Sequence, residues 1–184
     1  DGLTYTPDFN FNGTDTLAVE ANDRGFTGSS GALSDFAQVV IHLNPIIDGA
    51  PVVTGATTTY GNQTFTGLEI HANPADGPEV AFFRITGITN GRLYHNDGRT
   101  EIVNNNFITA FEGAVGLKFT PTANPRANGS FSVQAALSDS SNGSGLGGAI
   151  ATATITVAKA DQFIAFPTLP TKVVGDPAFA LNAS

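Results

Sequence analysis

Few residues of this chain have the type and spacing of a catalytic or cofactor site. Its three histidines, His42, His71 and His95, lie in or beside expected strands, without the sequence pattern of an activated nucleophile. Residues 143–148 have the G-x-G-x-x-G spacing of a dinucleotide-binding loop, but that site requires a helix directly after the glycines. Residues 149–157 instead alternate in the manner of a strand, so the glycines are expected to form a loop. The sequence therefore predicts a non-enzymatic protein.

A carbohydrate-binding surface would need exposed aromatic side chains as platforms for a sugar ring. The chain has no tryptophan, and most of its 14 phenylalanines occupy strand positions that are expected to face the core. Phe9, Phe11 and Phe26 are exceptions, because they lie in expected loops. A carbohydrate-binding module is therefore the alternative function, with these side chains as candidates and surface glycans as partners.

The charge balance excludes some classes of partner. With 16 acidic and 8 basic residues the formal net charge is −8, whereas a phosphate-binding surface needs clustered basic residues. We therefore expect no nucleic-acid partner. No apolar run approaches the roughly 18 residues of a membrane span, and the absence of cysteine excludes disulfides and thiolate metal sites.

One short sequence motif occurs twice and indicates the architecture. Residues 2–7, GLTYTP, match residues 116–121, GLKFTP. The match continues from 12–14 to 128–130, from Asp23 to Asp139 and from 31–33 to 148–150, at an offset of 114 to 117 residues. A fixed internal period is the signature of a repeat protein. The chain is therefore expected to be a piece of a tandem array.

Short runs rich in β-branched and aromatic residues, separated by Gly, Asn-Gly and Asp-Gly, predict an all-β fold. Strands are expected at 3–6, 16–21, 36–43, 52–54, 57–60, 64–72, 80–86, 92–95, 100–103, 116–120, 130–137 and 149–157. Residues 96–98, Asn-Asp-Gly, predict a hairpin turn, because glycine permits the positive φ of a tight turn. Only residues 108–115 look helical. This spacing of short strands predicts a β-sandwich.

Four segments follow from the repeat. Residues 1–43 are expected to be the C-terminal half of one unit, and residues 44–51, which contain two prolines, the linker. Residues 52–158 are expected to be one complete unit. From residue 159 the pattern changes, and residues 159–184 are expected to be the first strands of a further β-sandwich, at 162–166, 171–174 and 178–181.

The repeated sequence resembles the sequences of a known group of proteins. Residues 2–17, GLTYTPDFNFNGTDTL, and 21–25, ANDRG, are similar to the bacterial cadherin-like repeats of very large secreted surface proteins of the adhesin type. Residues 44–51, NPIIDGAP, resemble their linkers, and 159–166, KADQFIAF, resembles the start of a neighbouring immunoglobulin-like domain. The resemblance implies tandem cadherin-like and immunoglobulin-like β-sandwiches, one complete and two partial. It also implies a structural or adhesive role in an extracellular, cell-surface filament.

The resemblance further implies calcium at the junctions between units, where carboxylates of linker, loops and strand ends converge. Calcium takes roughly six to eight oxygen ligands. Near the 43–52 junction the implied ligands are Asp23, Asp48, Asp76, Glu79 and Asp139. The chain departs from the family pattern in two places, because Asp48-Gly49 replaces the usual Asn-Asp pair and Arg24 follows Asp23. The alternative is that these carboxylates only form turns by bonding to their own backbone.

The partial units leave apolar surface without a cover. Three strands with one apolar face are a poor independent domain, because a sandwich needs a second sheet over that face. We therefore expect the faces and open edges of 1–43 and 159–184 to be covered. The cover is expected to be either the missing part of the repeat or a neighbouring copy, added head to tail by strand complementation.

Overall fold

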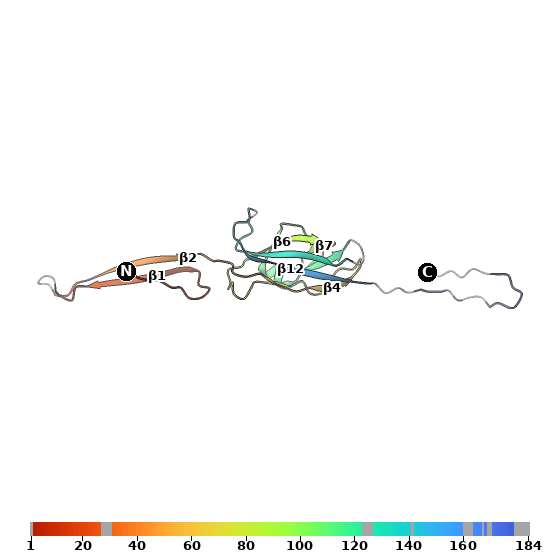
Figure 1. Cartoon of the computed structure of the whole chain (residues 1–184), viewed down its shortest axis with the longest axis horizontal. Helices are drawn as coiled ribbons and strands as arrows, with labels where there is room; N and C mark the ends of the chain where they lie inside the picture. Colours follow the sequence, from red (N-terminus) through yellow and green to blue (C-terminus); the bar gives the residue numbers. More distant parts are fainter. Residues whose placement is uncertain are drawn as a thin grey trace.

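The computed structural model describes residues 2–26, 31–122, 127–140, 142–159, 164–166, 168 and 171–178. It is mostly β, with 43% strand and 4% helix, and its several sheets include a curled half-barrel. The expected β-rich class is therefore confirmed. The parts follow one another along a single long axis, with an N-terminal hairpin first, then a central unit, and the C-terminal residues beyond it (Figure 1).

The N-terminal hairpin consists of β1 (Gly13–Asn22) and β2 (Ser34–Leu43), which pair antiparallel over their whole length. The two strands form a sheet of their own. The register places Leu17 opposite Val39, and residues opposite one another in an antiparallel pair share a face. Because side chains alternate along a strand, the hairpin has one face with most of its aliphatic residues and one mainly polar face.

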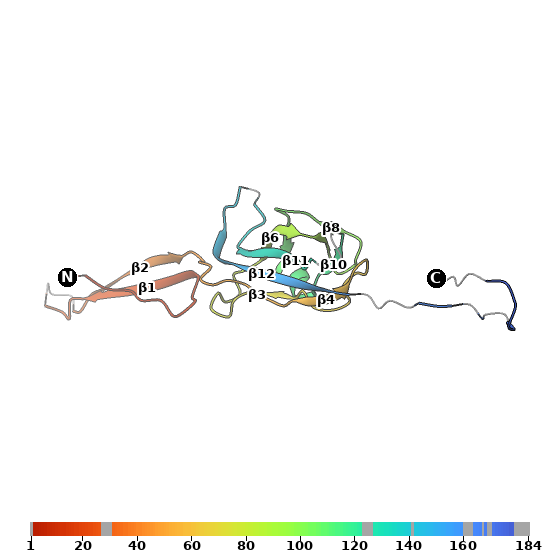
Figure 2. The same ribbon diagram turned by 45° about the vertical axis from the view of Figure 1, so that its right-hand side comes forward.

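Ten strands and one short helix form the central unit in the part of the chain that the structure describes. Their bounds are β3 (Val52–Val53), β4 (Ala56–Thr59), β5 (Ile70–His71), β6 (Phe82–Thr89), β7 (Gly91–Tyr94), β8 (Glu101–Ile102), β9 (Phe107–Thr109), α1 (Ala110–Val115), β10 (Lys118–Pro121), β11 (Gly129–Ala136) and β12 (Leu146–Ala158). A five-stranded sheet has the order β4-β12-β11-β6-β9, a three-stranded sheet has the order β10-β7-β8, and β3 pairs with β5. Figure 2 labels β4, β12, β11 and β6 of the first sheet and β10 and β8 of the second.

The core of the central unit is built from both of its larger sheets. Phe83 and Ile85 on β6, and Phe131 and Val133 on β11, are fully buried in the five-stranded sheet. Phe119 on β10 joins the same core from the three-stranded sheet. The alternation of buried and half-buried residues along β11 follows from the two-residue period of a strand.

Helix α1 is a single short element whose start is fixed by a capping box. The backbone N–H of Glu112 donates to Thr109 Oγ1, and the carboxylate of Glu112 accepts from the backbone N–H of Thr109. Gly116 ends the helix with φ of +87°, a conformation that glycine adopts without strain. The helical prediction for this stretch is confirmed from Ala110 onward. None of the helices found in the described ranges has the length and apolar character needed to cross a membrane.

The hairpin turn expected at 96–98 is confirmed. Strands β7 and β8 pair antiparallel on either side of it. The backbone N–H of Gly98 donates to the carbonyl of His95, and the N–H of His95 donates to the carbonyl of Thr100, both at 2.9 Å. Gly98 has φ of +68°, which explains why glycine stands there.

Two expected strands are not formed as predicted. Residues 3–6 form no strand, and of residues 64–72 only the two residues of β5 pair in a sheet. The second difference has a local cause, because Gly67 and Leu68 have φ of +87° and +58°. Left-handed backbone of this kind interrupts the extended conformation that a strand ladder needs.

The second half of the expected linker packs on the central unit. Ile47 is 7% exposed and belongs to the core, and Pro51 is also buried. The carbonyl of Ala50 accepts a hydrogen bond from Asn73 Nδ2 at 3.0 Å. The chain is therefore held by the central unit from about Ile47 onward.

The described C-terminal residues, 164–166, 168 and 171–178, form no strand. The strands expected at 162–166 and 171–174 are thus absent from the described part of these runs, and 179–181 lies outside it. Apolar side chains such as Ile164, 69% exposed, have no cover. A strand forms only against a partner strand, and among the described residues none pairs with this stretch.

Candidate functional site

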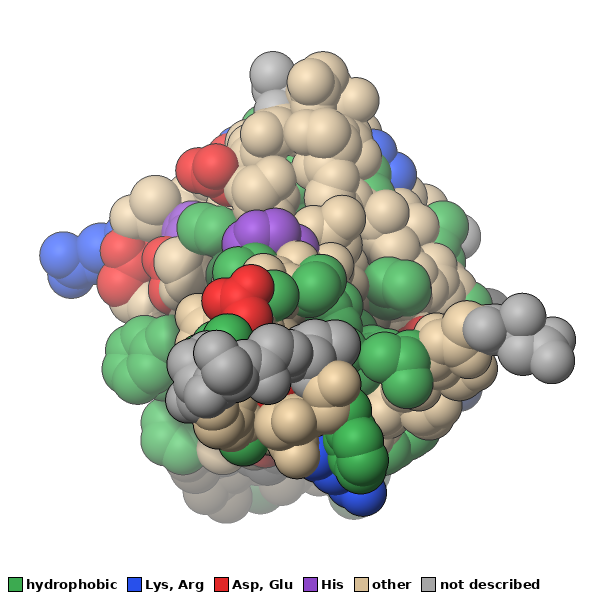
Figure 3. Space-filling view, turned by 90° about the vertical axis from the view of Figure 1, so that its left-hand side faces the viewer, with side chains coloured by type: hydrophobic (Ala, Val, Ile, Leu, Met, Phe, Trp, Pro, Cys, Tyr) green, Lys and Arg blue, Asp and Glu red, His purple; other side chains and the backbone are tan. Residues whose placement is uncertain are grey.

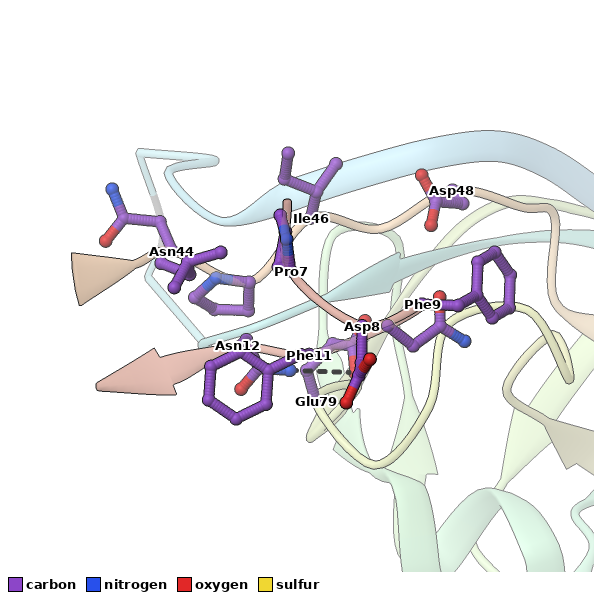
Figure 4. A pocket seen from close by; sticks show the side chains of 12 residues that line it. Pro7, Asp8, Phe9, Phe11, Asn12, Asn44, Ile46, Asp48 and Glu79 are labelled. Atoms are coloured by element: carbon purple, nitrogen blue, oxygen red, sulfur yellow. Dashed lines mark hydrogen bonds between the residues drawn. The ribbon is translucent and has the colours of Figure 1, made fainter. Parts of the chain in front are cut away.

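The candidate site is the junction between the N-terminal hairpin and the central unit. A hollow of about 290 Å³ lies there, with walls from both parts (Figure 4). Its lining consists of Pro7, Asp8, Phe9, Asn10, Phe11, Asn12, Leu43, Asn44, Pro45, Ile46, Asp48 and Glu79. Two of the five predicted ligands, Asp48 and Glu79, line this hollow, and a third, Asp76, bonds to the linker beside it.

Asp76 is the buried carboxylate of the junction. Its side chain is 0% exposed, and Oδ1 accepts hydrogen bonds from the backbone N–H groups of Asp48 at 2.7 Å and Gly49 at 2.9 Å. A turn that begins at Asn73 positions it, closed by the bond from the N–H of Asp76 to the carbonyl of Asn73. Its second oxygen, Oδ2, is buried without a hydrogen-bond partner. A buried acceptor without a partner is costly, so a cation or a donor would be stabilising at this oxygen.

A direct side-chain contact also joins the two parts. Asn12 Nδ2, just before β1, donates to Glu79 Oε2 at 3.4 Å, the dashed line in Figure 4. Asp48 lies on the linker, apart from Glu79 in the same view. The junction is therefore crossed by a long hydrogen bond between side chains, while backbone groups of the linker are held by Asp76.

The expected convergence of Asp23 with the other carboxylates is not seen. The linker leaves the hairpin at Leu43, and Leu43 pairs with Gly13 at the other end of β1. At the turn of the hairpin, Asp23 Oδ1 accepts hydrogen bonds from the backbone N–H groups of Gly25 and Leu33, both at 2.8 Å. This is the arrangement of a carboxylate that forms a turn, the alternative that the sequence left open.

Asp139 is exposed in the loop between β11 and β12. Among the described residues, no three acidic, histidine or cysteine side chains are close enough together to hold a metal ion. The five predicted ligands therefore divide into Asp48, Asp76 and Glu79 at the junction, Asp23 at the far end of the hairpin, and Asp139 in a separate loop.

A second hollow, of about 480 Å³, lies between α1 and the turn that joins β7 to β8. His95 Nδ1 lies 3.2 Å from Glu112 Oε1 within it, and Phe111 is 77% exposed. The backbone N–H of Thr109 lowers the pKa of Glu112, because it donates to the ionised carboxylate. Sequence reasoning missed this pair, although the spacing from Thr109 to Glu112 is a helix-start signal that could have placed Glu112.

Asp97 in the same hollow is a turn carboxylate. The Thr100 hydroxyl and the backbone N–H groups of Arg99 and Thr100 donate to it and lower its pKa to about 2. Since Glu112 is likewise engaged by the start of α1, both carboxylates serve local structure. A general acid would instead need a carboxyl group whose pKa is raised.

The glycine-rich stretch 143–148 is a turn that continues into β12, so a strand follows it as predicted. Gly148 has φ of +64°, and a Cβ atom there would collide with the carbonyl oxygen of Gly49. Gly147 lies similarly close to Ile47. These two glycines therefore permit the linker to pack closely on β12.

The three loop phenylalanines are accessible, as a glycan platform would require. Phe9 and Phe26 are 86% and 87% exposed, and Phe11 is 39% exposed. Phe9 and Phe11 line the junction hollow. Phe26 lies beyond the end of β1, at the opposite end of the hairpin.

No protein-family model, curated protein or solved structure matches this chain. Its function is therefore inferred from its own residues and their geometry.

Proposed function

We propose that this chain is a non-enzymatic structural or adhesive segment of a large extracellular surface protein. In this proposal the central unit is a cadherin-like β-sandwich, the N-terminal hairpin belongs to a second unit of the same kind, and residues 159–184 begin an immunoglobulin-like domain. Neighbouring repeats, or copies of the same protein, are its partners.

One observation carries the proposal: the residues that follow the repeated motif form an antiparallel hairpin in both copies, at two places along one long axis. Strands β1 and β2 form the first hairpin and β11 and β12 the second. Gly13, opposite Leu43, corresponds to Gly129, opposite Ile155. Units that recur along one axis favour a spacer or filament, because each repeat contacts mainly its neighbours.

Stretching single molecules tests the structural role. A load-bearing unit should resist force and then unfold in one step. Unfolding should lengthen the molecule by on the order of 350 Å, the extended length of about 110 residues. The matched control is Phe131→Ala, which weakens the core and should lower the unfolding force. Gradual extension without a step would contradict a load-bearing role.

Adhesion needs a separate measurement. Beads coated with the chain should cluster, or attach to cells or matrix, in proportion to coating density if the segment is adhesive. Beads coated with the chain after thermal unfolding are the control for non-specific sticking. Equal attachment of both kinds of bead would leave the structural role and remove the adhesive one.

Calcium at the junction is part of the proposal in a narrower form. The group that would bind the ion is the buried oxygen Oδ2 of Asp76, which has no hydrogen-bond partner. Asp48 and Glu79 line the hollow beside it, but the described carboxylates do not form a cluster of three, so the other ligands would have to be carbonyl oxygens and water. When bound, the ion would neutralise the carboxylate of Asp76 and stiffen the junction. Calcium should then raise the melting temperature relative to a chelator, and Asp76→Asn should reduce this rise. Identical melting curves with and without calcium would rule the ion out.

A carbohydrate-binding module is the second candidate. It is favoured by the two accessible rings of Phe9 and Phe11 beside Asn12 and Glu79, which supply polar groups next to an aromatic platform. A glycan array tests it: saturable binding that Phe9→Ala or Phe11→Ala abolishes would support this function. The matched control is Phe65→Ala, because Phe65 is 87% exposed and does not line the hollow.

A further inference from the structure

The face of β1 that carries Leu17 corresponds position by position to the buried face of β11 in the central unit. With Gly13 aligned to Gly129, Leu17 stands at the position of Val133 and Val19 at that of Ala135. The other positions, Thr14 and Thr16, align with the half-buried Ser130 and Ser132 of β11. Strands β1 and β11 therefore have the same division into an apolar and a polar face.

The same positions differ in exposure. Val133 and Ala135 are fully buried, whereas Leu17 is 38% and Val19 40% exposed. Val39, opposite Leu17, is 52% exposed. Seen along the long axis from the hairpin end, hydrophobic side chains reach the surface between charged ones (Figure 3). An exposed aliphatic face on a two-stranded sheet marks an interaction surface.

The central unit shows what completes such a hairpin, with strands at its two edges and a second sheet that contributes to the core over its face. Strand β6 pairs antiparallel with β11, setting Ile85 opposite Val133 and Phe83 opposite Ala135. Strand β4 pairs in parallel with β12, and the three-stranded sheet contributes Phe119 to the core from β10. In the described part of the chain, β1 and β2 pair only with each other, so both of their outer edges are open.

The segment before β1 extends the correspondence. Residues 4–7 align with β10, which pairs with β7 in the central unit, yet they form no strand. Tyr5 takes the position of Phe119 and Asp15 that of Phe131. The Tyr5 hydroxyl donates to Asp15 Oδ2 at 2.7 Å. A hydrogen-bonded pair therefore stands where the central unit has two buried rings, and it remains satisfied if it becomes covered.

We propose that the apolar face of β1 and β2 docks a polypeptide segment with the pattern of residues 51–115 of this chain. Such a segment supplies an antiparallel strand like β6 to the outer edge of β1 and a parallel strand like β4 to β2. It also supplies a strand like β7 to residues 4–7. This inference rests on the second unit in the proposed function and deepens it by naming the segment that would complete that unit. The stretching experiment above tests the structural role separately, since it concerns the central unit alone.

A second copy of this chain is a poorer occupant for two reasons. Its own residues 51–115 already pack against β11 and β12, where Phe83 and Ile85 are fully buried. Each copy also carries a net charge of −8, which opposes association. The occupant must therefore have a free segment of this pattern.

The test joins a second copy of residues 51–115 directly ahead of Gly2 of the full chain. Val115 then precedes Gly2 as it precedes Gly116, so the natural spacing is kept. Hydrogen exchange is measured at the β1 amides that point away from β2. These amides should exchange about a hundredfold more slowly in the fusion than in the original chain, because they gain strand partners.

Two variants and one size measurement make the outcome decisive. Phe83→Asp in the added copy alone, or Leu17→Asp in the hairpin, should abolish the added protection while the central unit stays protected. Light scattering should show a monomeric fusion. Unchanged exchange in the fusion would overturn the proposal. Equally, outer β1 amides already protected in a dimer of the original chain would make a second copy the occupant and overturn it.

Discussion

The N-terminal hairpin and the β11–β12 hairpin follow the same repeated motif and both pair antiparallel, but only the second is buried. Val133 on β11 is fully buried against β6, whereas Leu17 at the matching position of β1 is 38% exposed. The exposed hairpin is the more regular one, since β1 pairs with β2 over its whole length, whereas the pairing of β11 with β12 shifts register between Val133 and Ala135. The comparison teaches that this sequence pattern is sufficient for a hairpin, while burial depends on the segment that precedes it.

The largest expected difference between the two hairpins is in the cost of losing a large side chain. Phe131→Ala should destabilise the central unit by about 3–5 kcal/mol, because it leaves a cavity in a close-packed core. Asp15→Ala, at the matching position of the first hairpin, should leave the unfolding midpoint of the central unit unchanged. Chemical denaturation followed by circular dichroism measures both. Equal effects would mean that the two hairpins unfold as one body.

Matched glycines give the next largest difference. Gly148→Ala should cost about 2–4 kcal/mol, because the new Cβ collides with Gly49 and occupies a left-handed conformation. Gly31→Ala, at the corresponding position of the first hairpin, adds a Cβ at φ of +83° with no atom within 4 Å. It should cost about 1 kcal/mol, confined to the hairpin. The comparison fails if both variants lower the melting temperature of the central unit equally.

The attachment of the linker is the third point of difference. Asp76→Ala should destabilise the central unit by about 1–3 kcal/mol, because the N–H groups of Asp48 and Gly49 lose their acceptor. Their hydrogen exchange should accelerate in the same variant. Asp23→Ala, which removes the acceptor of Gly25 and Leu33 in the first hairpin, is the matched control and should change only the hairpin. Unaltered exchange at Gly49 would show that the linker is held by other contacts.

The smallest expected effect concerns protonation in the first hairpin. The hydrogen bond from Tyr5 lowers the pKa of Asp15 and raises that of Tyr5. A carboxylate with a lowered pKa contributes stability above its ordinary value near 3.8, and this is lost as pH falls through the folded-state pKa. In Tyr5→Phe, NMR titration should find the pKa of Asp15 shifted upward. Asp97, with a pKa of about 2, should not change and serves as the internal reference.

Predictions from local pattern were the reliable ones. The turn at Gly98, the helix that Thr109 caps and the strand after the glycine-rich loop are each fixed within a few residues by φ preference, capping or alternation. The strand expected at 64–72 failed for a reason of the same scale, because left-handed backbone at Gly67 and Leu68 interrupts it. Local signals therefore placed most elements, but they missed this interruption, the absence of a strand at residues 3–6, and strand β9.

The candidate site depends on contacts between distant segments, which local sequence patterns do not predict. The sequence prediction places Asp23 with the junction carboxylates. In the structure Asp23 lies at the turn of the hairpin, one strand length away from the junction, about 30 Å for ten residues. Hairpin topology alone would have corrected that placement. Neither the burial of Asp76 nor its bonds to the linker N–H groups can be read from a turn motif, because burial depends on packing by distant segments.

The β-rich class, the recurrence of one hairpin and the turns can be predicted from the sequence alone, because all of these follow from neighbouring residues. Contacts between distant segments bring Ile47 into the core and bind the linker to Asp76. They also bury Val133, whereas Leu17 stays exposed. Leu17 and Val133 are both apolar residues in regular strands. What separates them is the long-range pairing of β6 with β11, for which the first hairpin has no counterpart among the described residues.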